Sequence, residues 1–304
     1  EWGSVAVGVS GGVVTDGRSS AGGRVGARHG AAINDQVGEC NAALKVNGSG
    51  DAYPDFGVIE GNTLRNGSVR DTGNPVTLID LVAASHWRIR GNRISDFVKG
   101  QSDRISYGAF VKGGGEDNRF ERNVVVCEDA LRGSAGQRVG LSLGGGGSSK
   151  EACRDHQCIT EQDGGVIGSN LIISCSDDGI YLNRAAMSSI TQNTLIDTGG
   201  ITARFGESSA DVDGNLVDGP IRAVADATLH LDDNIDTRTA ALYLGWHPVR
   251  RLFTDPLALD LRWRGDPPRQ RNVREPGADL CGMPRPRQPT YGAFEDIARC
   301  AIGN

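Results

Sequence analysis

The chain has 304 residues, a net charge of −6 and only 5% aromatic residues, while glycine occupies 44 positions. The acidic balance and the scattered basic residues argue against a nucleic-acid partner, and no apolar run is long enough to cross a membrane. The low aromatic content argues against a core packed by large rings, and a glycine content about twice the usual ~7% predicts many tight corners.

The first 40 or so residues are rich in Gly, Ala and Val, and their repeat frame is uncertain. We interpret them as early coils of the repeat that follows. The N-terminal residues Glu1-Trp2-Gly3 lack the basic-then-apolar pattern of a signal peptide. We therefore expect either a cytosolic chain or, as preferred below, a mature secreted or periplasmic chain whose signal has been removed.

An asparagine frame recurs from residue 62 onward, with an apolar residue three positions before each asparagine and another two positions after it. The frame is centred on Asn62, Asn92, Asn123, Asn170, Asn193 and Asn215, with an imperfect copy at Asn234. The last intervals, 23, 22 and 19 residues, indicate a solenoid of short strands. We interpret the asparagines as scaffold: they tolerate left-handed backbone at a corner, and their amides can bond to the neighbouring coil.

Short segments with period-2 alternation lie between these frames, and helical spacing is poor. The leucine-rich repeat has a similar length, but its frame is absent. The sequence therefore predicts an all-β protein, a single-stranded right-handed parallel β-helix over residues 1–236 whose coils stack about 4.8 Å apart.

Two intervals between asparagines are longer, 31 and 47 residues. The extra residues fall in 100–106 and 144–165, the second of which carries a run of four glycines. Insertions in a solenoid commonly map to one face, often the binding face. The glycine run is not a phosphate loop, because it lacks the Gly-Lys-Ser/Thr ending.

Alternate positions of the strands between the frames are expected to face solvent on one sheet. Counting from the frames aligns Asp80, Phe110, Lys112, Ser142, Gly144, Tyr181, Asn183, Thr202, Arg204 and Arg222. A basic, partly aromatic track on an acidic protein suggests an anionic polymer, and a uronic-acid polysaccharide fits an elongated groove.

Cleavage of such a polymer by β-elimination needs a base, an acid and neutralisation of the carboxylate. We expect Lys112 to be the base, with Arg204 and Tyr181 as acid or charge stabiliser. The expected substrate-binding residues are Phe110, Arg138, Asn183, Arg184, Arg222 and Asp80.

The acidic pair Asp177-Asp178 precedes a predicted strand at the edge of the track. With Glu161 it could bind Ca²⁺, which takes several carboxylate oxygens. It could instead supply the acid and base of a glycoside hydrolase, or form a turn in which Asp bonds its own backbone.

Seven cysteines and five scattered histidines show no paired C-x-x-C metal pattern. We therefore predict disulfides and an oxidising compartment, with Cys153–Cys158 and Cys281–Cys300 as the expected bonds. Cys127 and Cys175 follow consecutive frames and are either bonded or buried.

Residues 237–304 break the period and are rich in Pro and Arg. We predict an irregular C-terminal cap that covers the open end of the helix, since an uncovered end exposes strand edges. We expect a monomer without nucleic-acid or membrane partners.

The asparagine frames give residues 40–236 a resemblance to the pectate-lyase-like β-helix superfamily. Within it, Tyr107-Gly108-Ala109-Phe110-Val111-Lys112-Gly113-Gly114 resembles the catalytic-lysine strand of chondroitinase-B-like and alginate lyases. That resemblance implies a Lys base at Lys112, an Arg acid at Arg204 and often Ca²⁺. The segment Tyr291–Glu295 resembles the closing segment of many such proteins.

Two other functions remain open at this point. Asp177-Asp178-Gly179-Ile180 resembles the paired-aspartate strand of polygalacturonase-like hydrolases, although their Gly-His-Gly and Arg-Ile-Lys motifs are missing. A noncatalytic glycan-binding surface protein on the same scaffold is the third hypothesis.

Overall fold

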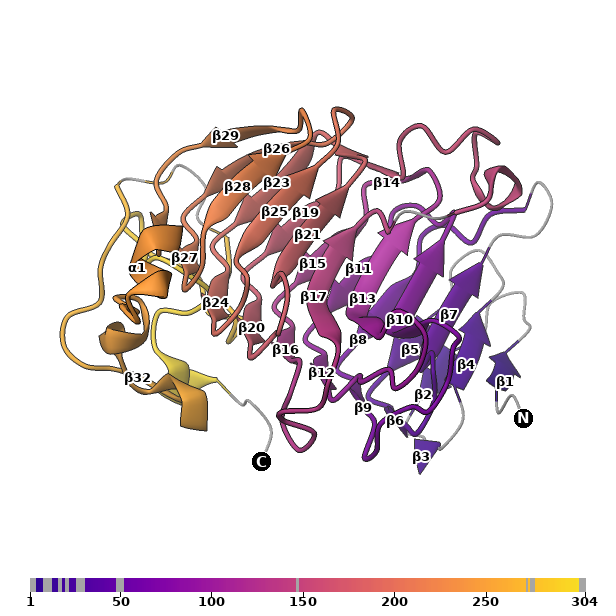
Figure 1. Ribbon diagram of the computed structural model, residues 1–304, viewed down its shortest axis with the longest axis horizontal. Coiled ribbons are helices and arrows are strands. Elements are labelled where there is room, and N and C mark those ends of the chain that lie inside the picture. Colours follow the sequence, from indigo (N-terminus) through magenta and orange to yellow (C-terminus); the bar gives the residue numbers. More distant parts are fainter. Residues whose placement is uncertain are drawn as a thin grey trace.

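Three long parallel sheets form the body of the protein, seen in a computed structural model (Figure 1). The structure describes residues 4–7, 13–15, 18–19, 22–25, 31–47, 52–145, 148–271, 273 and 277–300, with side chains from residue 31 onward. Each sheet has nine strands within these residues. Successive coils add one strand to each sheet, so the predicted parallel β-helix is confirmed.

The strands of each sheet follow one another along the stack. Sheet A consists of β1 (Ser4–Val7), β4 (Gly22–Val25), β7 (Leu44–Asn47), β10 (Val76–Val82), β13 (Ile105–Lys112), β17 (Gln137–Leu143), β21 (Ile180–Asn183), β25 (Ile201–Arg204) and β28 (Ile221–Val224). Sheet B consists of β2 (Val13–Thr15), β5 (Ala31–Ile33), β8 (Val58–Glu60), β11 (Arg88–Arg90), β15 (Arg119–Glu121), β19 (Val166–Gly168), β23 (Ser188–Thr191), β26 (Ser209–Asp213) and β29 (Thr228–Leu231). Sheet C consists of β3 (Arg18–Ser19), β6 (Gln36–Gly38), β9 (Thr63–Arg65), β12 (Arg93–Ser95), β16 (Val124–Val126), β20 (Leu171–Ile173), β24 (Thr194–Ile196), β27 (Leu216–Val217) and β30 (Ile235–Asp236).

Shorter elements complete the chain. A three-stranded parallel sheet extends the middle coils through β14 (Gly115–Glu116), β18 (Gln162–Asp163) and β22 (Ala185–Ala186), and β31 (Phe253–Asp255) pairs antiparallel with β32 (Asp260–Trp263). The helical elements are α1 (Thr239–Tyr243) and the 3₁₀ turns η1 (Lys150–Ala152), η2 (Arg250–Leu252), η3 (Pro256–Ala258) and η4 (Ile297–Arg299). None of the helices among the described residues has the length and apolar character needed to span a membrane.

The asparagines form a buried ladder at the corner between sheets B and C. Nδ2 of Asn170 donates to Oδ1 of Asn193, and Nδ2 of Asn193 donates to Oδ1 of Asn215, at 3.0 and 2.9 Å. The amide therefore bonds to the neighbouring coil, as predicted. The left-handed backbone lies one residue earlier than expected, for example at Gln192 (φ 54°), and Asn193 then directly precedes the next strand, β24.

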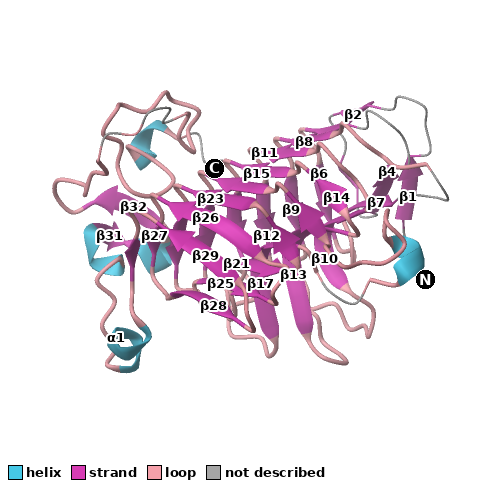
Figure 2. Ribbon diagram, turned by 90° about the horizontal axis from the view of Figure 1, so that it is seen from above, coloured by secondary structure: helices cyan, strands magenta, loops and turns pink. Residues whose placement is uncertain are grey.

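The core inside the coils is built from the inward residues that the period predicts. Ala109, Val111, Leu141, Leu143, Ile180, Leu182, Ile201 and Ala203 are all 0% exposed. Viewed from above, the strands of the three sheets stack along the length of the molecule (Figure 2). The buried side chains from Ala32 to Val217 form one apolar core between them.

The C-terminal segment packs on the outer face of sheet C. Val249, Phe253, Leu261, Ala293 and Phe294 pack with the outward side chains of sheet C in one apolar cluster. Among the described residues nothing fully covers the last coil: Leu231, which pairs with the buried Val212, is 55% exposed, and Ala223, which pairs with the buried Ala203, is also exposed. The described part of the segment therefore packs on the helix mainly against the apolar outer face of sheet C, and within these residues the end of the last coil stays partly exposed.

Three disulfides are present, and Cys40 is a buried free thiol. Cys153–Cys158 and Cys281–Cys300 are the two expected bonds. The third, Cys127–Cys175, joins adjacent coils at the ends of β16 and β20.

Candidate functional site

The outer face of sheet A carries the residues that the sequence aligned. The register places Asp80, Phe110, Ser142, Tyr181, Thr202 and Arg222 in one column across the strands. A second column contains Lys112, and Asn183 pairs with Arg204 further along it. The alignment from the asparagine frames is thus confirmed strand by strand.

Much of this face is packed rather than open, which corrects the expectation of a solvated track. Phe110, Ser142, Asn183 and Thr202 are at most 8% exposed. Asp80 is also buried, and it pairs with Nζ of Lys45 at 2.8 Å. Phe110, Asn183 and Asp80 therefore offer little surface to a polymer.

Tyr181 is half-buried and lies at the centre of the part of the outer face of sheet A that remains accessible. Its phenol oxygen accepts from Nδ2 of Asn183 at 3.3 Å and lies within the influence of the exposed, positively charged side chain of Arg204. Burial raises the pKa of Tyr181, and the positive charge of Arg204 partly opposes that shift. The phenol is therefore kept protonated beside a cation.

Asp178 lies on the other side of Tyr181, in the turn before β21. Its Oδ1 accepts from the hydroxyl of Thr202 at 2.7 Å and from Nη2 of Arg222 at 3.3 Å. Burial raises the pKa of Asp178 to about 6; the hydrogen bond from Thr202 opposes the shift, and the charge of Asp177 adds to it. Such a carboxyl titrates near neutral pH, as a general acid or base requires.

Two neighbours complete the cluster. Burial raises the pKa of Tyr107 to about 12, with the nearby Tyr181 and Asp177 adding to the shift. The guanidinium groups of Arg184 and Arg204 both lie over the ring of Phe205, 5.3 and 5.1 Å from its centroid. We call Tyr107, Asp177, Asp178, Tyr181, Thr202, Arg204 and Arg222 the tyrosine–aspartate site.

Lys112 lies apart from this site. Its Nζ is 4.6 Å from the centroid of Phe110, and a Cβ at Gly145 would come within 2.9 Å of its Cδ. Phe110 is two coils before Tyr181 in the shared column, roughly 10 Å between backbones. The predicted direct cooperation of Lys112 with Tyr181 and Arg204 is therefore not seen.

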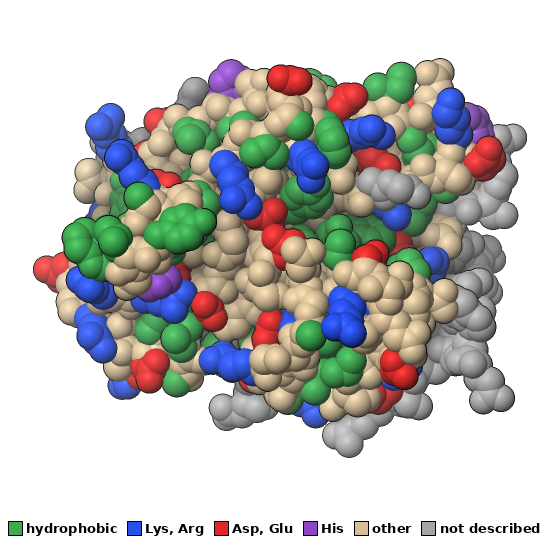
Figure 3. All heavy atoms as spheres, in the orientation of Figure 1, with side chains coloured by type: hydrophobic (Ala, Val, Ile, Leu, Met, Phe, Trp, Pro, Cys, Tyr) green, Lys and Arg blue, Asp and Glu red, His purple; other side chains and the backbone are tan. Residues whose placement is uncertain are grey.

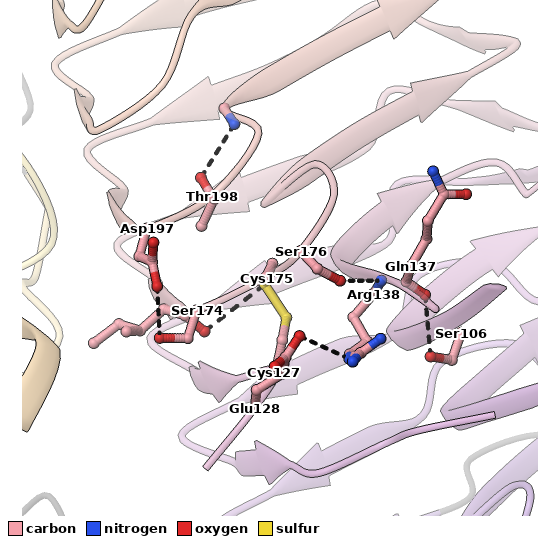
Figure 4. Close-up of a disulfide and its surroundings, with 12 residues drawn as sticks. Ser106, Cys127, Glu128, Gln137, Arg138, Ser174, Cys175, Ser176, Asp197 and Thr198 are labelled. Atoms are coloured by element: carbon pink, nitrogen blue, oxygen red, sulfur yellow. Dashed lines mark hydrogen bonds and ion pairs between the residues drawn. A yellow bond between two sulfur atoms is a disulfide. The ribbon is translucent and has the colours of Figure 1, made fainter. Parts of the chain in front are cut away.

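Arg138 has a structural position rather than a substrate-binding one. It is 1% exposed, and its Nε lies 2.9 Å from Oε1 of Glu128 beside the Cys127–Cys175 disulfide (Figure 4). Burial lowers the pKa of Arg138, and Glu128 opposes that shift. The expected substrate contact is wrong because the side chain turns beneath the surface to this carboxylate.

The proposed Ca²⁺ ligands do not converge. Glu161 is 1% exposed and accepts from the backbone N–H of Gly113 and the hydroxyl of Ser148. Glu161 lies beside Gly144, since a Cβ added to Gly144 would be 3.1 Å from the Cβ of Glu161. Gly144 is in the column of Asn183, at the end of β21. Asp177 and Asp178 precede the start of β21, so they lie at the opposite end of that strand from Glu161. No cluster of three or more metal-ligating side chains occurs in the part of the chain that the structure describes.

The long insertion, residues 144–165, is anchored to the early coils and lies beside Lys112. Both terminal nitrogens of Arg154 bond to the carboxylate of Asp55, at 2.5 and 3.0 Å, and its guanidinium stacks on Tyr53. The hydrogen bond from Arg154 lowers the pKa of Asp55, against the opposing effect of burial. The second insertion is therefore held against the early coils at the edge of the candidate face.

The space-filling view shows this face as hollowed across its middle (Figure 3). Acidic and hydrophobic side chains line the hollow, and basic side chains lie along its upper rim. Sequence reasoning missed Tyr107 and Phe205 as members of the surroundings; Phe205 directly follows Arg204, so its position next to a candidate residue was a usable signal.

Scans against family models, curated proteins and solved structures found no match to this chain.

Proposed function

We propose that the tyrosine–aspartate site cleaves a uronic-acid-containing polysaccharide by β-elimination. The proposal is carried by one observation: a protonated phenol, Tyr181, stands between an exposed arginine, Arg204, and a carboxyl whose pKa is about 6, Asp178. Acid, base and carboxylate-neutralising cation thus flank a single position on one sheet.

The elimination assigns each group a role. Asp178 takes the proton from C5 of the uronate, the electron pair forms the C4=C5 double bond, and the C4–O4 bond breaks. Tyr181, which its raised pKa keeps protonated, delivers a proton to the departing O4. Arg204 pairs with the C6 carboxylate and stabilises the charge that develops there; Lys112, about two coils away, binds the carboxylate of a neighbouring sugar.

The fold and the chemistry together support a place among pectate-lyase-like β-helix enzymes and a secreted or periplasmic location. Three disulfides favour an oxidising compartment. Ca²⁺, if bound, would be held with the substrate carboxylate rather than by a preformed protein cage.

A panel of alginate, chondroitin, pectate and glucuronan tests the proposal. Ultraviolet absorbance of the unsaturated uronate should rise with at least one of them, and a chelator arm measures any Ca²⁺ requirement. Folded protein that yields no unsaturated product from any of the four contradicts it.

Hydrolysis is the second candidate, favoured by the carboxyl pair itself. Below about pH 6 Asp178 is largely protonated and can act as general acid, with the half-buried Asp177 as base. New reducing ends without ultraviolet absorbance identify this reaction. Saturable binding without either product identifies the noncatalytic glycan-binding protein.

A further inference from the structure

An apolar projection stands at the C-terminal end of sheet A. Thr237 donates its backbone N–H to the carbonyl oxygens of Val217 and Gly219, and the chain returns where Nδ1 of His247 lies 2.9 Å from Oδ1 of Asp218. Between these anchors α1 extends outward on the sheet-A side of the stack, as both ribbon views show (Figures 1 and 2).

The tip of this projection consists of exposed apolar side chains. Tyr243 is 88% exposed, Leu244 is 67% exposed and Trp246 is 60% exposed. Hydrophobic side chains gather at the position of α1 in the space-filling view (Figure 3). We call these three residues the aromatic tip.

Backbone and ionic contacts, rather than the apolar side chains, hold the aromatic tip in place. The backbone N–H of Trp246 donates to the carbonyl of Ala241 at 2.8 Å. Arg250 bonds to the carboxylates of Asp218 and Asp197 below it. Because the two rings are exposed and do not pack in the core, while the backbone that carries them is anchored, we infer that they have a binding role.

The aromatic tip continues the tyrosine–aspartate site along the stack. Asp178 precedes β21, and the equivalent turn before β28, two coils later, contains Gly219, which anchors the projection. The separation of these turns is roughly 10 Å. Arg222 on β28 lies between the two, since it reaches back to Asp178. A chain that runs past Tyr181 along the stacking direction therefore meets the tip.

We propose that Tyr243 and Trp246 form a sugar-stacking subsite for the same polysaccharide, so that the polymer extends from Tyr181 toward the C-terminal end of the stack. This inference rests on the proposed function for the identity of the sugar. Aromatic rings present a flat, electron-rich face that suits the C–H face of a pyranose, while a Tyr hydroxyl or Trp N–H bonds to its hydroxyls. A lipid surface is disfavoured as the occupant, because the chain is acidic and anionic membranes attract basic segments.

Binding measured without turnover tests the subsite. On a Tyr181→Phe background, the Tyr243→Ala/Trp246→Ala variant should bind the uronate polymer about tenfold more weakly. A disaccharide, too short to reach the tip, should bind both proteins equally. Met187→Ala is the matched control, since Met187 is 71% exposed and lies between β22 and β23, outside sheet A.

The outcomes separate the two proposals. The subsite is overturned if the Tyr181→Phe protein binds the polymer with the same affinity with and without the two tip substitutions. It is also overturned if those substitutions instead abolish self-association in sedimentation or binding to anionic lipid vesicles. If the wild-type protein binds the polymer through the tip and releases no product, the subsite stands and β-elimination fails.

Discussion

Nη2 of Arg222 lies 3.3 Å from Oδ1 of Asp178, although β28 and the turn before β21 are two coils apart. Thr202, on the strand between them, bonds to both partners, at 2.8 Å from Nε of Arg222 and at 2.7 Å from Asp178. Side chains from three successive coils therefore meet at the carboxyl of Asp178, and the protonation of that carboxyl is coupled to the stability of the stack.

Stability should depend on pH through Asp178. Its pKa is raised from 3.8 to about 6 in the folded protein, so the folded state holds an extra proton between these values. The stability that this group contributes is fully present below about pH 4 and is lost as the pH rises through 6, a change on the order of 3 kcal/mol. Urea denaturation of wild type and Asp178→Asn at pH 4 and 7 checks it, because the variant lacks this slope.

Asp103 supplies the control of opposite sign. Its hydrogen bond from Lys99 lowers its pKa, so its contribution is present at neutral pH and lost on acidification. Asp103→Asn should therefore flatten the acid limb instead. A wild-type minus Asp178→Asn difference that stays constant from pH 4 to 7 contradicts the prediction.

Tyr181→Phe should abolish most of the activity, because it removes the proton donor while keeping the ring. We expect a loss of about 10²- to 10⁴-fold in kcat with little change in KM. Tyr53→Phe removes a phenol that only bonds to Arg154 in the insertion, and its kcat should match wild type. Equal rates for the two variants would exclude Tyr181 as the proton carrier.

Replacing Arg138 should lower the stability of the fold, whereas replacing Arg204 should lower the activity. Arg138→Ala leaves Glu128 buried without its partner, so unfolding should become easier by about 3–5 kcal/mol. Arg204→Ala changes an exposed side chain, so its stability should stay within about 0.5 kcal/mol while the rate on uronate polymer falls. Denaturant titration paired with the elimination assay measures both, and a stable Arg138→Ala protein with impaired KM would restore the substrate-binding interpretation.

The loss of stability on replacing an asparagine of the ladder should depend strongly on how deeply that asparagine is buried. Asn193→Ala removes an amide that donates to Ile167 and Asn215 and accepts from Asn170, all buried, and should cost about 3 kcal/mol or more. Asn234→Ala acts on the last, half-buried rung and should cost about 1 kcal/mol. Thermal or urea unfolding compares the two; equal losses would mean that the ladder does not act through burial.

The period of the sequence was sufficient for the coil register and the inward residues, since each follows from one repeating frame. The frame also starts earlier than expected: Ala32 and Val37 flank Asp35, whose backbone N–H donates to Oδ1 of Asn62. The asparagine pattern does not predict this rung, because an aspartate stands where the later coils have asparagine.

Two strands of sheet C carry a sequence signal for the course of the C-terminal segment. Val124-Val125-Val126 and Leu171-Ile172-Ile173 are apolar at every position, and such unbroken runs are typical of strands buried on both faces. They indicate that the outer face of sheet C is covered. A strand exposed on one side would have kept alternation.

The site was only partly predictable, because strand alternation gives direction and not burial. Phe110 and Asn183 point outward as expected, yet neighbouring side chains cover them. The pairing of Arg138 with Glu128 depends on the loop between β16 and β17, whose path no periodic pattern specifies.

The bond between Cys127 and Cys175 has a consequence for how the molecule comes apart. A solenoid loses its terminal coils first and frays inward one repeat at a time. A covalent link between adjacent coils halts that advance, since both must open together. Fraying from the N-terminal end should therefore pause at this rung, three residues before Asp178, and leave a partly unfolded intermediate in which the half bearing Tyr181 and Arg204 remains folded.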